Sequence, residues 1–570
     1  MNPTPRPVRL FRTLRPLRPV RPLRPFGMRL APLIAALSLG LTTASHAAPT
    51  PLPPIADGLP KASHFALPNG LEVLLVPNVN NPILELHLGF RTGSGADALS
   101  KEGTASLLGR MTTAGLEDLP EQALAKELAR LGAWISADVA LESFSIGGQV
   151  PTFDNAEVLR FLDLFFRVAL DNPLPADLLE REKTLRLGAL SRALDNADAL
   201  ADVAAAMVAQ PGAHGRPGFG TFTSIPTLTR DDLVTFRDRV FAPKNAVLVI
   251  GGAFDEAGLT AWLTERLATW NPPVTIEKGL LPGRPARLCR DNRCLDNLVA
   301  TPSTATVSAD TLLITIDDPN LSQIPFRLVG KNPIAMLDPR WSAFRLGTFI
   351  LGGDFTSRLM QTLRVREGLT YGAYFSPDFG AYESGAMMVS TDATPDALSK
   401  AITLAKAELT TFIETPIPSD ELERSRLMLI EAFAFKFETI SKTLEQYTSH
   451  ALASIPLTWL ADWKRHLAAP TADDISLTLG PIAPDKLALI VAGPASLEAQ
   501  LKALGHGKLR VISARDLLTS PSVSAPQRAE TRGDRSDRAD GPSRPLRGSG
   551  AAARADVSPH PRARHPGPLR

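Results

Sequence analysis

Ala242-Pro-Lys-Asn-Ala-Val-Leu-Val-Ile-Gly251 matches a second stretch of the same chain, Ala483-Pro-Asp-Lys-Leu-Ala-Leu-Ile-Val-Ala492, at an offset of 241 residues. An earlier pair, Pro175-Ala-Asp-Leu-Leu-Glu-Arg181 and Pro418-Ser-Asp-Glu-Leu-Glu-Arg424, agrees at an offset of 243. Two matches in the same order at nearly one offset indicate an internal duplication. We therefore predict two homologous halves, residues 49–280 and 309–517, joined by a linker at residues 281–308.

Each half carries the pattern of a mixed α+β unit. Short apolar runs broken by Asn and Pro predict strands, and leucines spaced by three and four residues predict helices. The expected strands of the first half are Leu71–Val76 paired with Leu84–Phe90, then Trp134–Ile146 and Ala246–Ile250. The expected helices run from Pro120 to Gly132 and from Ala176 to about Leu194. The second half repeats this order from about Thr311 to Leu517.

The N-terminus has the layout of a signal peptide. Arg recurs every third residue from Arg6 to Arg24, and an apolar run from Leu30 to Leu41 ends near Ala47. The run is too short for a comfortable membrane span, and small residues before the expected cut suit a signal peptidase. We predict that residues 1–48 are removed, with Met28 as an alternative start, that no stable membrane span remains, and that the mature protein is periplasmic.

The charge is unevenly distributed along the chain. Taking the +8 of residues 1–48 and the +5 of residues 521–570 from the formal net charge of +2 leaves −11 for the body. Neutralising phosphates requires Lys and Arg, so an acidic body argues against nucleic acid as a partner. Residues 518–570 are rich in Ser, Pro, Arg and Gly, and we expect them to form a disordered tail.

The chain contains two cysteines, Cys289 and Cys294, both in the linker. Two thiols alone cannot complete a structural zinc site. In an oxidising compartment they are expected to close a small disulfide loop, and two unpaired surface thiols are the alternative.

Leu351-Gly-Gly-Asp-Phe-Thr-Ser-Arg358-Leu, followed by Leu363-Arg-Val-Arg-Glu-Gly-Leu-Thr-Tyr371, resembles the second-half signature of the pitrilysin or insulinase family of zinc peptidases. The likeness covers most of residues 60–517, including the Asn69-Gly70 opening and the duplication itself. The resemblance implies two homologous halves that form half of a clamshell. It also implies a zinc ion held by an H-x-x-E-H motif in the first half and by a later Glu.

This sequence departs from the family at every one of those metal positions. The expected His, Glu and His map to Ser106, Gly109 and Arg110, and the expected third ligand maps near Ala189. Zinc catalysis needs imidazole ligands and a carboxylate that activates water, whereas a guanidinium repels a cation. We therefore predict no metal and no cofactor on this chain. Glu182, earlier on the same helix as Ala189, is expected to be a solvated surface carboxylate.

The resemblance also assigns a substrate-contacting pair in the second half, which maps to Arg364 and Tyr371. Both residue types are retained, and their donors suit the charge that develops on a carbonyl oxygen. The alternative is that Arg364 pairs with a surface acid and Tyr371 packs. Arg358, Arg366 and Glu367 are interpreted as solvated or as scaffold contacts.

The leading hypothesis is a non-catalytic subunit that pairs with a catalytic insulinase-like subunit carrying H-x-x-E-H and zinc. It would supply chamber wall and substrate contacts, and Trp134–Ile146 is where a peptide substrate would add as a strand. A structural or peptide-binding scaffold without a part in catalysis is the alternative. An independent hydrolase around Ser106 ranks below both, because the chain has no G-x-S-x-G elbow.

Overall fold

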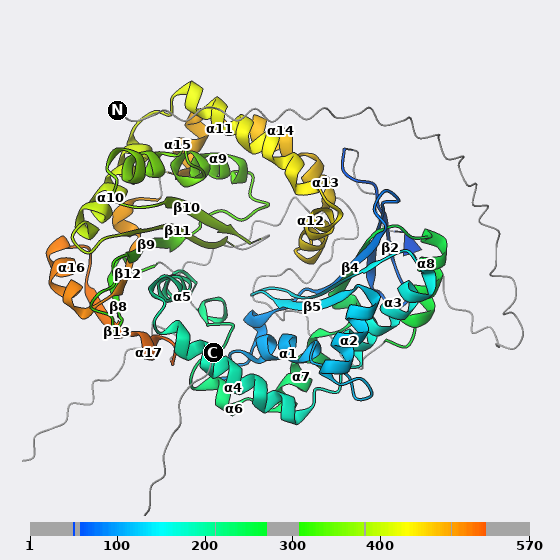
Figure 1. The fold of residues 1–570 in the computed structure, drawn as a ribbon. Coiled ribbons are helices and arrows are strands. Elements are labelled where there is room, and N and C mark those ends of the chain that lie inside the picture. The colour runs from blue at the N-terminus through cyan, green and yellow to red at the C-terminus, as the bar shows by residue number, and fades with distance from the viewer. Residues whose placement is uncertain are drawn as a thin grey trace, which may run out of the picture. The chain divides into compact units, whose positions relative to one another are not determined.

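The computed structural model describes residues 50–51, 58–210, 212–270, 307–380, 384–479 and 482–519. The expected signal peptide, the two cysteines and the tail beyond Thr519 lie outside these residues. Two mixed β-sheets, each flanked by helices, make up the described fold (Figure 1). Within the described ranges, none of the helices combines the length and the apolar character needed to cross a membrane.

The first half contains a seven-stranded sheet with the order β1-β2-β3-β7-β4-β6-β5. Its strands are β1 (Thr50–Pro51), β2 (Ser63–Ala66), β3 (Glu72–Pro77), β4 (Ile83–Phe90), β5 (Trp134–Val139), β6 (Phe144–Pro151) and β7 (Ala246–Gly252). Its helices are α1 (Thr104–Thr112), α2 (Glu121–Leu131), α3 (Asn155–Leu170), α4 (Ala176–Ala193), α5 (Ala197–Ala209), α6 (Ser224–Thr227), α7 (Arg230–Val240) and α8 (Glu256–Arg266).

The second half contains a six-stranded sheet with the order β10-β11-β9-β12-β8-β13. Its strands are β8 (Thr311–Thr315), β9 (Ile324–Lys331), β10 (Ala373–Phe379), β11 (Ser384–Ala393), β12 (Ala488–Gly493) and β13 (Leu509–Ser513). Its helices are α9 (Trp341–Gly352), the π-helical η5 (Met360–Arg366), α10 (Leu398–Glu414), α11 (Ser419–Glu431), the 3-10 helix η6 (Ala432–Phe437), α12 (Ile440–Leu452), α13 (Leu457–Ala461), α14 (Trp463–Ala468), α15 (Ala472–Leu479), α16 (Glu498–Leu504) and α17 (Ala514–Leu517).

The topology confirms the duplication. Five strands of the first sheet run β5-β6-β4-β7-β3, and their counterparts in the second run β10-β11-β9-β12-β8 in the same order. The inner parallel pair, β3 with β7, recurs as β8 with β12. Helices α5 and α12 have the same length and begin at Ala197 and Ile440, so the offset inferred from sequence holds for them.

The predicted helices are confirmed, but two strand predictions are wrong. β3 and β4 do not pair with each other, because β7 arrives from far along the chain and inserts between them. Residues 134–146 form a hairpin rather than one strand: β5 ends at Val139 and β6 begins at Phe144. The spacing of apolar residues predicts which residues are buried, but it does not predict which strands pair with each other in the sheet.

Each sheet is covered on one face by a helix from the other half. Along β7, Leu248 and Ile250 belong to the core of the first half, whereas Val247 and Val249 pack with α12 of the second half. Successive side chains of a strand point to opposite faces, so β7 is buried on both sides. Burial on both faces accounts for its unbroken apolar sequence.

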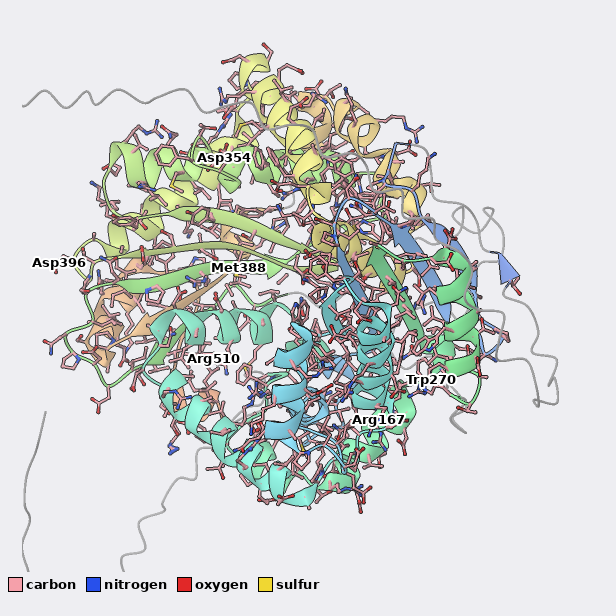
Figure 2. All side chains as sticks on the ribbon, turned by 45° about the vertical axis from the view of Figure 1, so that its right-hand side comes forward. Arg167, Trp270, Asp354, Met388, Asp396 and Arg510 are labelled. Atoms are coloured by element: carbon pink, nitrogen blue, oxygen red, sulfur yellow. The ribbon has the colours of Figure 1, made fainter. Side chains whose placement is uncertain are left out.

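The reciprocal contact places α5 of the first half against the second sheet. Ala488 and Ile490 of β12 join the core around α5, while Leu489 and Val491 face the other core with α9 and α10. Met388 of β11 lies above α5 (Figure 2) and packs against the same core. The two helices therefore exchange places between the halves, as the ribbon in Figure 1 shows.

Specific contacts fix both exchanged helices. A Cβ at Gly251 would lie 2.7 Å from side-chain atoms of Ile440 and Leu444, so this glycine leaves room for α12. On the other sheet the buried Arg327 of β9 donates to Asp198 at 2.6 Å and to Asp202 at 2.8 Å, both on α5. These charge-assisted bonds set the register of α5 on the sheet.

Candidate functional site

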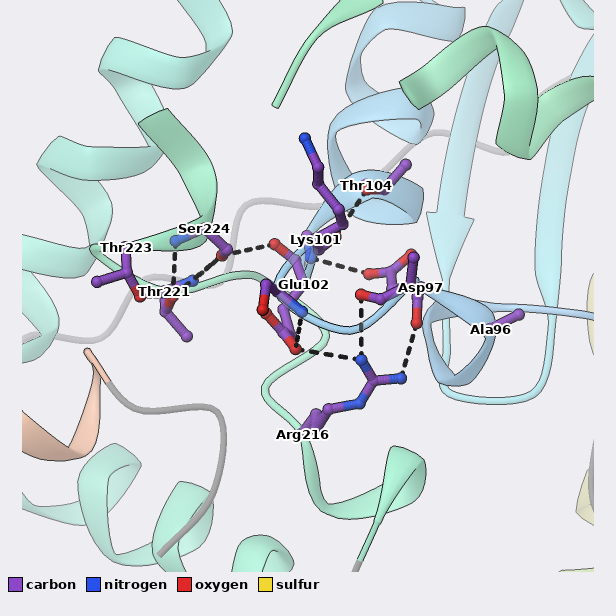
Figure 3. Close-up of polar contacts among 12 residues, drawn as sticks. Ala96, Asp97, Lys101, Glu102, Thr104, Arg216, Thr221, Thr223 and Ser224 are labelled. Atoms are coloured by element: carbon purple, nitrogen blue, oxygen red, sulfur yellow. Dashed lines mark hydrogen bonds and ion pairs between the residues drawn. The ribbon is translucent and has the colours of Figure 1, made fainter. Parts of the chain in front are cut away.

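Helix α1 carries three of the four predicted metal positions, and a buried polar network fixes its first turn (Figure 3). The carboxylate of Asp97 accepts hydrogen bonds from the backbone N–H groups of Gly103, at 2.8 Å, and Ala105, at 3.0 Å. Gly103 adopts a left-handed conformation with φ of 95°, which favours glycine at this position. Burial raises the pKa of Asp97 to about 7.

Arg216 ties this first turn to the rest of the first half. Its guanidinium donates to the Glu102 carboxylate at 3.1 Å and to the Asp97 carbonyl oxygen at 2.7 Å. The carbonyl oxygen of Glu102 accepts from the Ser224 hydroxyl at 2.8 Å. Asp97 and Glu102 are both buried, so the start of α1 is a rigid, fully partnered structure.

The two helices that carry the four predicted metal positions, α1 and α4, pack against each other. Ser106 on α1 accepts a hydrogen bond from Arg186 on α4 at 2.7 Å. A Cβ at Gly109 would lie 2.9 Å from Val139 on β5, so α1 lies close against that strand. Ala189 follows Arg186 by three residues on the face that lines a neighbouring cavity.

Glu182 corrects one expectation. Its side chain is buried rather than solvated, and its carboxylate pairs with Arg110 at 3.4 Å and with Arg181 at 3.0 Å. Sequence reasoning missed Arg186 altogether. The available signal was its spacing: Glu182, Arg186 and Ala189 recur at helical intervals of four and three, and therefore share one face of α4.

The residues present do not fit the zinc ion that the family implies. Two guanidinium groups, of Arg110 and Arg186, stand among the positions where imidazoles would be needed, and Ser106 is engaged by one of them. Burial lowers the pKa of Arg186, and the positive charge of Arg110 acts in the same direction. Across the described ranges, no group of three or more His, Cys, Asp or Glu side chains is arranged to hold a metal ion.

The predicted pair in the second half comes together on the surface. The Cζ atom of Arg364, on η5, lies 5.3 Å from the ring centre of Tyr371 and 5.0 Å from that of Phe355. Tyr371 is 85% exposed and Phe355 is 55% exposed. Neither alternative for the pair is observed, because Tyr371 is not packed and no acid within the described segments pairs with Arg364.

The charged neighbours of this pair brace it, as expected of scaffold contacts. Arg358 makes a two-pronged ion pair with Glu421 of α11, at 3.0 and 2.7 Å. Glu367 pairs with Lys400 of α10 at 2.7 Å. These contacts attach both ends of η5 to the helices behind it.

Strand β5 forms the outer edge of the first sheet. In the part of the chain that the structure describes it pairs with β6 alone, which leaves its other side open. Its side chains alternate between exposed and half-buried, and Trp134 is 42% exposed. An open edge of this kind can accept an extended peptide through backbone hydrogen bonds.

Comparison with known proteins finds similarity to one family. The family model described as the peptidase M16 inactive domain matches residues 227–429. An uncharacterized zinc protease of Mycobacterium tuberculosis is 27% identical over 359 residues, which are 61% of this chain and 73% of that protein. The non-peptidase homolog YmxG of Helicobacter pylori is 24% identical over 385 residues, which are 66% of this chain and 81% of that protein.

Solved structures share the fold. The peptidase M16 inactive domain from Pseudomonas fluorescens has a TM-score of 0.65 at 22% identity, covering 76% of this chain and 98% of that one. The periplasmic protease PqqL from Escherichia coli has a TM-score of 0.60 at 15% identity, covering 81% of this chain and 52% of PqqL. The two sheets thus form an insulinase-like half-clamshell.

The region matched by the family model begins after α1 and α4, the helices that carry the predicted metal positions. The duplicated sheets, the sequence from Leu351 to Tyr371 and the relatives agree on one assignment. This chain is similar to the pitrilysin or insulinase-like peptidases, the M16 family, and its sequence contains no H-x-x-E-H motif.

Proposed function

We propose that this chain is a non-catalytic subunit of a periplasmic insulinase-like zinc peptidase. Its partner would be a catalytic insulinase-like subunit that carries H-x-x-E-H and the zinc ion, and its own role would be chamber wall and substrate contact. One observation carries the proposal: guanidinium groups stand among the predicted metal positions of the first half, whereas in the second half a half-buried Arg364 and an exposed Tyr371 remain together at the surface.

The chemistry of Arg364 and Tyr371 supports a role at the active site of a partner subunit. A guanidinium offers forked, permanently charged donors, and the Tyr371 hydroxyl offers one more, which suits a carbonyl oxygen that gains negative charge. In a zinc peptidase such donors act on the carbonyl that a zinc-activated water attacks. Since the residues of this chain do not fit zinc, the reacting centre would belong to the partner.

The relatives support the arrangement and the location. This chain spans about half the length of PqqL, which is a periplasmic protease, so a second half-clamshell would complete a chamber of similar size. The expected signal peptide agrees with export. A peptide bound along the open edge of β5 would be held by backbone hydrogen bonds, which accept many sequences.

The first experiment is to purify the tagged chain gently from its own host and identify what accompanies it while measuring peptide cleavage. A partner with H-x-x-E-H, and cleavage only in the complex, would support the proposal. Recovery of the chain alone, zinc-bound and active would overturn it.

Within that complex, Arg364→Ala should lower kcat on the order of 10²-fold, the usual effect of removing one oxyanion donor. Arg366→Ala is the matched control, because Arg366 lies on the same segment and contacts Thr362 and Glu408 instead. Unchanged turnover in Arg364→Ala would count against the shared site.

The alternative, a peptide-binding scaffold without a part in catalysis, is favoured by the open edge of β5. It predicts peptide binding without cleavage in every preparation, including the complex. A hydrolase centred on Ser106 has less support, because the Ser106 hydroxyl is hydrogen-bonded to Arg186, and a guanidinium cannot act as a general base. A serine-reactive probe that labels Ser106 would revive it.

A further inference from the structure

A cavity of about 270 Å³ lies beside the altered metal positions, between α4 and α5. Two of its wall residues, Arg186 and Ala189, belong to the face of α4 that would have completed a zinc site. The cavity is lined by Arg186, Ala189, Leu190, Ala193, Ala199, Leu200, Val203, Phe219 and Leu518. Small alanine side chains on both helices leave the space open.

The wall is apolar except at one point. Arg186 is the single charged residue of the lining, and it is half-buried. One of its N–H groups donates to Ser106, and none of the carboxylates that the structure describes forms an ion pair with it. Glu182, the nearest acid on its own helix, is engaged by Arg110 and Arg181.

An apolar wall with one guanidinium group favours a ligand that has an anionic group attached to an apolar portion. A half-buried guanidinium that forms no ion pair within the described part of the chain, with Glu182 held by two other arginines, is complemented by a carboxylate, which accepts two parallel hydrogen bonds from it. The apolar walls favour an aliphatic side chain attached to that carboxylate. The volume lies just below the range of about 300–1,000 Å³ that is typical of pockets for larger ligands, so it suits one residue rather than a long chain.

We propose that this cavity binds the C-terminal residue of a peptide, with its carboxylate on Arg186 and an apolar side chain between α4 and α5. The inference rests on the peptide-holding part of the proposed function and names the class of peptide end that is recognised. The site uses residues of this chain alone. It can therefore be tested without the catalytic partner, and its failure is separate from failure of the partnership.

The test is fluorescence polarisation with the isolated full-length chain and an N-terminally labelled Gly-Ser-Gly-Leu peptide, as the free acid and as the C-terminal amide. The acid should bind about tenfold or more tightly than the amide, since only the acid pairs with Arg186. Equal affinity of the two peptides, or binding of neither, would overturn the proposal without any variant having to fold.

Two variants locate the effect. Arg186→Met should abolish the preference for the acid, whereas Arg192→Met, an exposed arginine on the same helix, should retain it. Ala189→Glu would place a carboxylate one helical turn from Arg186 and should also abolish acid binding. An acid preference that survives in Arg186→Met would refute the site. Binding of octanoate but not of the peptide would show that the cavity accepts a free fatty acid rather than the C-terminal residue of a peptide.

Discussion

Replacing Leu444 by Ala tests the exchange of helices between the halves. Leu444 is fully buried on α12, and its Cδ2 atom lies 2.7 Å from where a Cβ of Gly251 would be, on a strand of the other half. Truncation leaves a cavity against a flat glycine surface that offers no side chain to fill it. Buried Leu→Ala changes cost roughly 2–5 kcal/mol, and poor relaxation places this one at about 3 kcal/mol or more.

The informative assay is native-state hydrogen exchange followed by mass spectrometry. Leu444→Ala should accelerate exchange in peptides that contain β7 and β4, although the substitution lies in the second half. Glu445→Ala, at the exposed neighbouring position on the same helix, is the matched control. Faster exchange confined to residues 311–517, with β4 and β7 unchanged, would refute the reasoning.

Three further predictions concern charge and metal. Burial raises the pKa of Asp97 from 3.8 to about 7, so the folded chain binds this proton more tightly than the unfolded chain does. The protonated side chain therefore contributes to the free energy of unfolding. That contribution is complete below about pH 4 and falls as the pH rises towards 7. In Asp97→Asn, the urea concentration at the unfolding midpoint should depend less on pH over this range. An unchanged pH dependence of the midpoint between pH 5 and 8 would contradict this. Arg327→Met should lower the free energy of unfolding by about 2 kcal/mol in denaturant titration, because it removes two charge-assisted hydrogen bonds to α5; a loss within the range of a surface ion pair would show that these bonds do not hold the helix. Elemental analysis of the mature chain should find well below one zinc per chain, and one tightly held zinc would contradict the interpretation of Arg110 and Arg186.

Much of the fold could be predicted from the sequence, because the duplication and the apolar spacing are local signals. The helices ending at Gly132 and near Leu194 were found within a residue or so of their observed ends. The insertion of β7 between β3 and β4 was not found, since strand order depends on contacts between residues far apart in the chain. The exchange of α5 and α12 was missed for the same reason.

The candidate site, like the fold, could be predicted from the sequence only in part. Ser106, Gly109 and Arg110 fall in a recognisable stretch of one helix, so the sequence alone could propose them as the metal positions, and that mapping stays a prediction. The burial of Glu182 could not be predicted, because it depends on α1 packing against α4 and bringing Arg110 to the carboxylate. Arg186 contacts Ser106 only because α4 packs against α1, and no local sequence pattern predicts that packing.

The exchange of α5 and α12 also bears on how such a chain could have arisen. The two helices occupy equivalent positions in the repeat, and each completes the sheet of the opposite copy. Two separate chains of one half each would make the same contacts as a domain-swapped homodimer. A single half on its own would leave an apolar sheet face and an apolar helix uncovered. The geometry matches that of a domain-swapped dimer whose two copies are joined in one chain, and co-expressed halves should reassemble without the covalent link.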